Sequence, residues 1–174
     1  FITCVNTLVE APPVIDHVHK FIERLQLYIE DRGLPVEVVE LTPDPEQTFW
    51  SNLIGRGYPT PVREFRWCTD RMKIRPATTF IEERAEIFGD PPVVHFLLGT
   101  RFDESAARKG TMDAHTRMDS DLHAHGTIPT ASTIRPIEDW STNDVWNYLL
   151  KLVWANGMPN PFADINQDLS MLYN

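Results

Sequence analysis

The sequence has few cysteines and no long apolar run. Its 174 residues contain two cysteines, Cys4 and Cys68, which are too few for the disulfide framework of a small secreted domain. No apolar stretch approaches the roughly 20 residues that a membrane-spanning helix needs, and no signal peptide is visible. These absences favour a cytoplasmic protein with reduced thiols and no membrane partner.

The chain is also short of positive charge. It has 16 Lys and Arg against 25 Asp and Glu, for a formal net charge of −9, which argues against non-specific nucleic-acid binding by the whole surface. A local basic patch stays compatible with this balance, because attraction of an anion depends on the field at the site. With a hydrophobic fraction of 42%, residues 1–174 are expected to form a single domain with its own core.

Both ends of the sequence read as internal. The chain begins at Phe1, within an apolar run and without a methionine, and it stops at Asn174 directly after a helix-like segment. We therefore expect a fragment of a longer protein, truncated at both ends.

The hydrophobic pattern predicts an α/β fold. Apolar runs at residues 1–5, 36–41 and 93–98 predict buried strands. Apolar side chains recur at helical spacing between Pro12 and Gly33, residues that suit the start and the end of a helix. A strand–helix–strand order implies parallel strands joined by a right-handed crossover. The other expected elements are helices at 48–54, from Thr78 or Thr79 to about Phe88, from Ser141 or Thr142 to Gly157 and at 164–173, a polar loop at 111–126, and an extended segment at 127–137.

The stretch Arg66–Pro76 surrounds Cys68 with basic side chains. Six of the sixteen Lys and Arg residues lie between positions 56 and 75. Such a setting lowers the pKa of a thiol and attracts anions. The stretch is either a solvated basic turn with a packed cysteine or a site for phosphate or sulfur chemistry. Cys68 itself could be a nucleophile, a metal or cluster ligand, or a small packed hydrophobe.

Two further segments follow predicted strands. Asn6–Glu10 follows the strand at 1–5, and Gly99–Arg108 follows the strand at 93–98, at the sheet edge where α/β proteins bind ligands. Arg101 and Arg108 bracket Glu104 and Ser105, so that two guanidinium groups, a hydroxyl and a helix start could hold an oxyanion. The alternative is an ordinary surface helix start with an Arg–Glu pair.

The remaining candidates favour structural roles. His123 and His125 could bind a metal, but no nearby carboxylate has a spacing that fixes a coordination geometry, so a solvated loop is favoured. Trp140 and Trp146 are expected to anchor the core. Cys4 lies inside a predicted strand and is expected to be packed.

Three segments, in this order, resemble motifs of the phosphoadenosine phosphosulfate (PAPS) reductase family. Arg66–Pro76 resembles its cysteine motif. Gly99–Arg108 resembles its Gly-x-Arg-x-x-Glu-Ser-x-x-Arg motif, and Pro136–Leu149 resembles its Pro-apolar-x-x-Trp-x-x-x-Asp-Val-Trp segment. Within the family, Thr7–Pro12, Thr48–Pro59 and the single Trp-Cys-Thr step at Cys68 resemble the DNA phosphorothioation sulfurtransferases of the DndC type. Reductases more often carry a double cysteine at that step, and Asn6 departs from the aspartate usual in the family.

The resemblance implies an adenine nucleotide α-hydrolase-like fold of the PP-loop ATP pyrophosphatase kind, with a parallel sheet flanked by helices. It implies a phosphate loop, Ser-Gly-Gly-Lys-Asp-Ser, before Phe1. It also implies further cysteines after residues 168–173 that join Cys68 in a 4Fe-4S cluster. The implied activity is cleavage of ATP, with Mg²⁺, to AMP and pyrophosphate, coupled to sulfur incorporation into the DNA backbone. The implied partners are DNA, a cysteine desulfurase and other proteins of a phosphorothioation system.

On this resemblance each candidate residue receives a role. Arg101 and Arg108 would bind phosphate, oriented by Glu104 and Ser105. A second anion, either pyrophosphate or DNA, would be held by Arg66, Arg71 and Lys73. The nucleotide would also contact Asn6 and Thr7, and Cys68 would be a cluster ligand. The alternatives are a reductase that forms sulfite from PAPS or its unphosphorylated analogue, and a non-catalytic binding module of a larger assembly.

Overall fold

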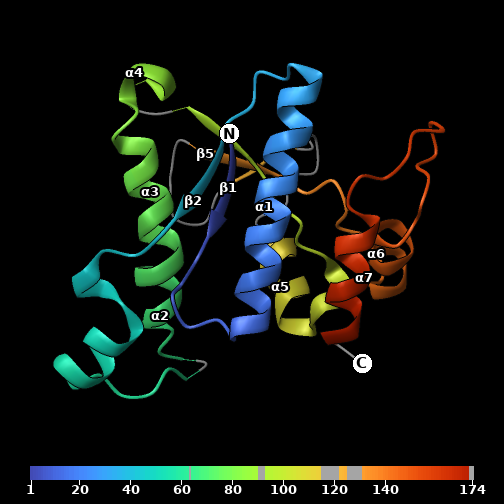
Figure 1. Cartoon of the computed structure of the whole chain (residues 1–174). Coiled ribbons are helices and arrows are strands. Elements are labelled where there is room, and N and C mark those ends of the chain that lie inside the picture. The colour runs from blue at the N-terminus through green and yellow to red at the C-terminus, as the bar shows by residue number, and fades with distance from the viewer. Residues whose placement is uncertain (63, 90–92, 115–121, 125–130, 173–174) are drawn as a thin grey trace. The chain divides into compact units, whose positions relative to one another are not determined.

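A computed structural model of the chain describes residues 1–62, 64–89, 93–114, 122–124 and 131–172 (Figure 1). The chain divides into two units. The first joins Phe1–Phe80 with Leu152–Asn174, and the second is Ile81–Lys151. Both combine helices with a small sheet that contains a parallel strand pair, so the predicted α/β class is confirmed. The single domain expected from the chain length stays a prediction.

The first unit is built around one strand–helix–strand motif. Strand β1 (Ile2–Val5) pairs in parallel with β2 (Val38–Leu41), with Ile2 opposite Val38. Helix α1 (Pro12–Arg32) connects them, as the sequence predicts. Prolines occupy the first helical positions, where a missing N–H costs nothing. The helix ends at Gly33, which has a left-handed φ of 58°, and the following N–H of Leu34 donates to the carbonyl of Ile29.

The segment around Cys68 is helical, not a turn. After η1 (Pro45–Gln47) and η2 (Ser51–Gly55) the chain runs through α2 (Trp67–Thr69), η3 (Asp70–Ile74) and α3 (Arg75–Glu82) without a break. The predicted start at Thr78 or Thr79 is therefore wrong. A wider π-helical turn precedes Pro76, in which the N–H of Arg75 donates to the carbonyl of Asp70. Because the hydrogen-bond pattern already changes there, the proline does not end the helix.

Helix α7 (Ala163–Leu172) packs against α1, although the two lie far apart in the sequence (Figure 1). The ring of Phe162, just before α7, lies 4.9 Å from the ring of Phe21 and 5.9 Å from that of Tyr28. The predicted last helix is thus confirmed, and it closes the apolar core of the first unit. The buried members of that core include Ile29, Leu41, Trp67, Met72, Phe80, Phe162 and Ile165.

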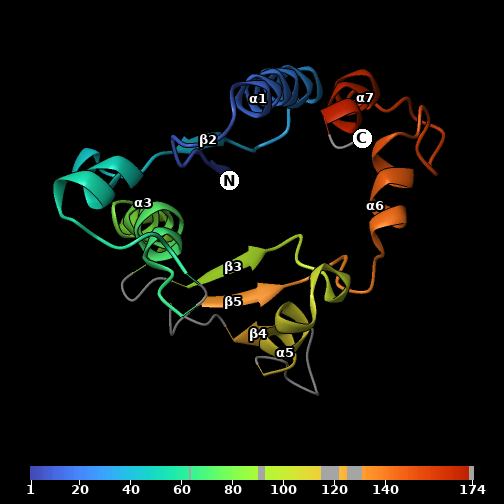
Figure 2. The ribbon, with the colours of Figure 1, turned by 90° about the horizontal axis from the view of Figure 1, so that it is seen from below.

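The second unit contains a three-stranded sheet in the order β3–β5–β4 (Figure 2). Strand β3 (Val94–Leu97) runs parallel to β5 (Ala131–Ile134), and β4 (His123–Ala124) runs antiparallel to β5. The helices of this unit are α4 (Ala85–Phe88), η4 (Phe102–Glu104), α5 (Ala106–Ala114) and α6 (Thr142–Leu149).

Two sequence predictions fail in this unit. The predicted polar loop at 111–126 begins inside α5, where Thr111 donates its hydroxyl to the carbonyl of Ala107 and Met112 is buried. It later contains strand β4, where His123 is also buried. Residues 115–121 and 125–130, which include His125 of the metal hypothesis and the start of the predicted extended segment, lie outside the described residues.

The helix predicted to end at Gly157 ends at Leu149 instead. Gly157, with φ of 80°, belongs to a separate turn in which Trp154 N–H donates to the carbonyl of Met158. Gly157 therefore lies within this turn and does not end a helix, contrary to the prediction from the sequence. Of the helices that the structure describes, none combines the length and apolar character needed to cross a membrane.

Candidate active site

Glu104 ties both arginines of the Gly99–Arg108 segment together. One carboxylate oxygen accepts the backbone N–H of Arg101 at 3.1 Å, and the other accepts Nε of Arg108 at 2.9 Å. The hydroxyl oxygen of Ser105 accepts the N–H of Arg108 and thereby caps the start of α5. The four predicted residues Arg101, Glu104, Ser105 and Arg108 therefore form one hydrogen-bonded group, placed just beyond the carboxyl end of β3.

The guanidinium of Arg101 is turned toward the start of α6. Its Nη1 lies 3.3 Å from the carbonyl oxygen of Trp140 and 3.4 Å from Oγ1 of Thr142, and the side chain is only 15% exposed. Asp103 accepts the N–H of Thr142 at 3.0 Å. Hydrogen bonds therefore join the arginine motif to the segment Pro136–Leu149. Arg108, whose side chain is 46% exposed, is the more open of the two cations.

The polar residues after β1 form a compact local network. The Thr7 hydroxyl donates to Glu10 at 2.6 Å, the Asn6 amide donates to Glu40 at 2.7 Å, and the Asn6 side-chain oxygen accepts the N–H of Leu8. Partial burial acts to raise the pKa of Glu10, but hydrogen bonds from the Thr7 hydroxyl and from the backbone of Glu10, Val9 and Thr7 lower it below its ordinary value. Asn6 and Thr7 thus shape an ordered, anionic loop at the edge of the sheet.

The neighbouring strand cysteine is not set up for reactivity. Burial raises the pKa of the Cys4 thiol, and the negative charges of Glu40 and Glu10 raise it further. A thiol held protonated in this way is a poor nucleophile, which agrees with the prediction that Cys4 is a packed strand residue.

Cys68 is a half-buried free thiol in the first helical turn after the loop. The preceding Trp67 is buried and donates its indole N–H to the carbonyl of Pro59 at 3.0 Å. Arg71 donates one η nitrogen to Gln47 and the other to the Tyr58 hydroxyl. Arg71 is therefore engaged in holding the 45–59 segment, whereas Arg66 and Lys73 are exposed.

The predicted residues thus fall into three local groups. Asn6 and Thr7 form the first, and the Cys68 segment forms the second, both in the first unit. Arg101, Glu104, Ser105 and Arg108 form the third, in the second unit. Sequence reasoning missed Gln47, Tyr58, Asp103 and Thr142, because their contacts join residues 13 to 39 positions apart and no local pattern indicates such pairs.

Cys68 is the one residue of this sequence that was predicted to bind the 4Fe-4S cluster, and it is a free cysteine. Within the described ranges, no group of three or more His, Cys, Asp or Glu side chains is arranged to hold a metal ion. Because an iron–sulfur cluster needs several cysteines, the residues described do not by themselves form a cluster site.

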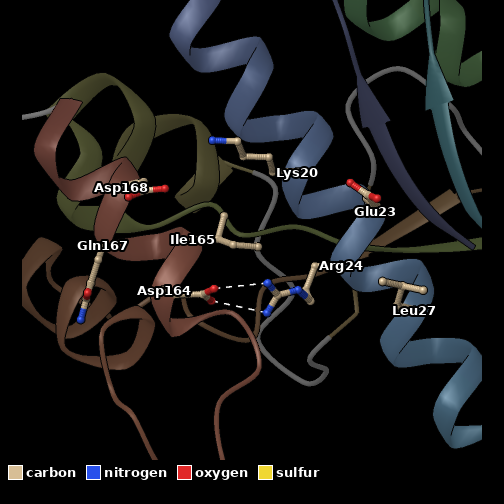
Figure 3. Close-up of a pocket in the computed structure, with 8 residues that line it drawn as sticks. All are labelled: Lys20, Glu23, Arg24, Leu27, Asp164, Ile165, Gln167 and Asp168. Carbon is tan, nitrogen blue, oxygen red and sulfur yellow. Dashed lines mark hydrogen bonds and ion pairs between the residues drawn. The ribbon is translucent and has the colours of Figure 1, made fainter.

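A pocket of about 510 Å³ lies between α1 and α7 (Figure 3). Arg24 of α1 reaches across it to the carboxylate of Asp164, with its Nη2 3.2 Å from Oδ2, and to the carbonyl of Pro161 at 2.8 Å. Lys20 and Asp168 face each other on its other side. The lining carries charges of both signs and includes no predicted site residue, so we interpret it as a packing groove.

Comparison with known proteins supplies a family. The family model described as phosphoadenosine phosphosulfate reductase domain matches residues 4–154. The chain is also 31% identical, over 105 residues, to an uncharacterized protein of Methanocaldococcus jannaschii. That alignment covers 60% of this chain and 19% of the relative, so the chain spans about a fifth of the length of that curated protein.

Proposed function

The chain belongs to the phosphoadenosine phosphosulfate reductase domain family, a family of enzymes, and on this basis we propose that it is the central part of an ATP pyrophosphatase-type sulfurtransferase. Its substrate would be a phosphate of the DNA backbone, which receives sulfur in place of one oxygen. The full-length enzyme would add a phosphate loop and further cysteines from outside the present sequence.

The observation that carries the proposal is the carboxylate-linked pair of arginines beyond β3. Ligands of α/β sheets bind at the carboxyl ends of parallel strands, and β3 is one of such a pair with β5. Phosphoryl chemistry depends on cationic groups fixed before the reaction more than on a protein nucleophile. Glu104 fixes Arg108 through Nε, which orients the guanidinium edge that recognises phosphate.

The proposed reaction has two balanced steps. A DNA phosphate oxygen attacks the α-phosphorus of ATP, the α–β bridge breaks, and pyrophosphate leaves. Hydrosulfide then attacks the adenylated DNA phosphorus, and AMP leaves with the original oxygen. A cysteine desulfurase would provide the sulfur as a persulfide, which a thiol reductant converts to hydrosulfide. In both steps Arg101 and Arg108 would offset negative charge on phosphate oxygens.

The choice of DNA as acceptor is supported by the segments that distinguish this chain within the family. Thr48–Pro59 and the single Trp67-Cys68-Thr69 step resemble the sulfurtransferase branch. These segments contact each other, since Trp67 donates to the carbonyl of Pro59 and stacks on Phe49. The branch-specific segment therefore builds the surroundings of Cys68.

The description of the matching family favours a second candidate, a reductase. In that reaction a dithiol would reduce the sulfuryl group of PAPS or its unphosphorylated analogue, releasing sulfite and the nucleotide and leaving a disulfide. It predicts thioredoxin-dependent sulfite formation without DNA. If the full-length protein forms sulfite and releases no pyrophosphate from ATP, the reductase is supported and the sulfurtransferase is rejected.

The proposal is tested by pyrophosphate release from ATP by the full-length protein, with and without DNA. Replacing Arg108 by alanine is expected to lower kcat by about 10²-fold, the usual effect of removing one charge-stabilising group. Arg101→Ala is expected to lower kcat by a similar factor, because it removes a phosphate-binding group and the contacts of Arg101 to α6.

Lys109→Ala provides the matched control. Lys109 is a neighbouring exposed cation on the same helix and lies over the ring of Phe102, so its loss should leave turnover within about twofold. Undiminished turnover in Arg101→Ala or Arg108→Ala would remove that arginine from the site. Absence of DNA-dependent pyrophosphate release in the wild type would reject the proposed function.

A further inference from the structure

Five aromatic rings in the first unit form a continuous row that passes Cys68. The order is Trp50, Phe49, Trp67, Tyr58 and Phe65, and we refer to them as the ring row. Successive ring centroids are 5.1, 5.4, 5.7 and 6.2 Å apart. Cys68 follows directly after the central member, Trp67, in helix α2.

The row is buried at its centre and open at its ends. Trp67 is 5% exposed, whereas Trp50 is 57% and Phe65 is 45% exposed. The large apolar side chains of Ile54 and Val62 on the same segments are also exposed. Burial therefore accounts for the central ring of Trp67 but not for the two rings at the ends of the row. Clustered exposed apolar side chains mark surfaces that bind a partner.

The surface has an excess of positive charge. Residues 56–75 contain six basic and two acidic side chains in a chain of net charge −9. Two of the six cations are paired, Arg75 with Asp70 at 3.0 Å and Arg56 with Glu46 at 3.6 Å, and the excess comes from the others. Arg66 and Lys73 are exposed, and Arg71 lies 5.1 Å from the centre of the Tyr58 ring. A partner that covers the ring row must therefore be anionic.

We propose that the ring row binds unpaired nucleic acid, with bases stacked on Trp50 and Phe65 and phosphates held by Arg66 and Lys73. Flat apolar groups joined by regularly spaced negative charges match this combination of rings and cations. This deepens the proposed function, on which it rests. The DNA beside Cys68 would be bound as a locally unpaired strand.

Affinity is measured by fluorescence anisotropy with a labelled 20-nucleotide oligothymidylate and the full-length protein, without ATP. Removing one stacking ring should weaken binding by about five- to a hundredfold, so Trp50→Ala and Phe65→Ala should each fall in this range. Trp50→Phe, which keeps a ring, should retain most of the affinity. Arg66→Ala should reduce the slope of log affinity against log salt by roughly 0.7.

Tyr148→Ala is the matched control, because Tyr148 is an aromatic residue with 46% exposure in the other unit. Equal affinity of Trp50→Ala and Tyr148→Ala would overturn the inference, and so would binding of a duplex as tightly as the single strand. No binding of either nucleic acid by the wild type would also overturn it and would point to a protein partner. Since the assay needs no turnover, its failure is separable from failure of pyrophosphate release.

Discussion

At the scale of single residues, Asn52 shows how a polar side chain can organise the segment next to Cys68. It is completely buried. Its amide nitrogen donates to the carbonyl of Thr48 at 2.9 Å, and its side-chain oxygen accepts from Arg56 at 3.3 Å. Its backbone carbonyl accepts the N–H of Tyr58. One residue thus links η2 to the loop that carries a member of the ring row.

Replacing Asn52 by alanine is expected to lower the free energy of unfolding by about 1–3 kcal/mol, because a buried acceptor and donor lose their partner. Urea denaturation would measure the change. Asn147→Ala is the control, since Asn147 is exposed on α6 and its loss should alter stability by less than about 0.5 kcal/mol. Equal effects of the two substitutions would show that the Asn52 contacts do not stabilise the segment.

At the scale of elements, helix α6 depends on a reciprocal cap at its first turn. The Ser141 hydroxyl accepts the N–H of Asp144 at 3.1 Å, and the Asp144 carboxylate accepts the N–H of Ser141 at 2.8 Å and its hydroxyl at 2.6 Å. Hydrogen bonds from the Ser141 side chain and then from its backbone lower the pKa of Asp144. The cap fixes the helix end at which Arg101 contacts Thr142.

Ser141→Ala should destabilise the protein by about 1 kcal/mol at neutral pH, the usual cost of losing a helix N-cap. The pKa of Asp144 is lower in the folded protein than in the unfolded chain. The stability it contributes is therefore present above the unfolded pKa and is lost as the pH falls through the folded pKa. The difference between wild type and Ser141→Ala should accordingly shrink on acidification, as measured by denaturation at a series of pH values.

Asn143→Ala, in the same exposed turn, should show a difference from wild type that does not vary with pH in this range. A Ser141→Ala difference that stays constant or grows at acid pH would contradict the link between the cap and the Asp144 carboxylate.

At the scale of the whole molecule, the first unit is assembled from the two ends of the chain. Residues 152–174 return to residues 1–80, and Phe162 packs against Phe21 and Tyr28 of α1. Arg24 adds its contacts to Pro161 and Asp164 (Figure 3). Since the Arg24–Asp164 pair is largely exposed, it adds little stability, and the aromatic contacts dominate.

Phe162→Ala should therefore lower the free energy of unfolding by about 3 kcal/mol, the cost of removing a buried aromatic side chain. It should also expose the C-terminal segment to limited proteolysis. Met171→Ala, at a position of α7 that is 69% exposed, should change neither measurement. Protease resistance equal to wild type in Phe162→Ala would show that α7 is held by other contacts.

Much of this arrangement follows from the sequence alone. Apolar periodicity and the Pro12 and Gly33 signals determine α1 and the parallel pair β1–β2, because these preferences act over a few residues. The same locality explains why the arginine motif and its Glu104 link could be predicted from a ten-residue segment. It also explains why short motifs, such as Arg66–Pro76 and Gly99–Arg108, are enough to indicate the family.

The rest is decided by tertiary contacts between residues distant in the sequence. Helix α5 extends to Ala114 with Met112 buried. Other contacts arise only when separate segments pack together. Gln47 and Tyr58 then hold Arg71, and Thr142 contacts Arg101. The sequence by itself thus determined the local elements and which charged and polar residue types lie at the site. Packing between distant segments decided which cations are anchored, such as Arg71 and Arg101, and which stay exposed, such as Arg66 and Lys73, because such contacts depend on the folded chain.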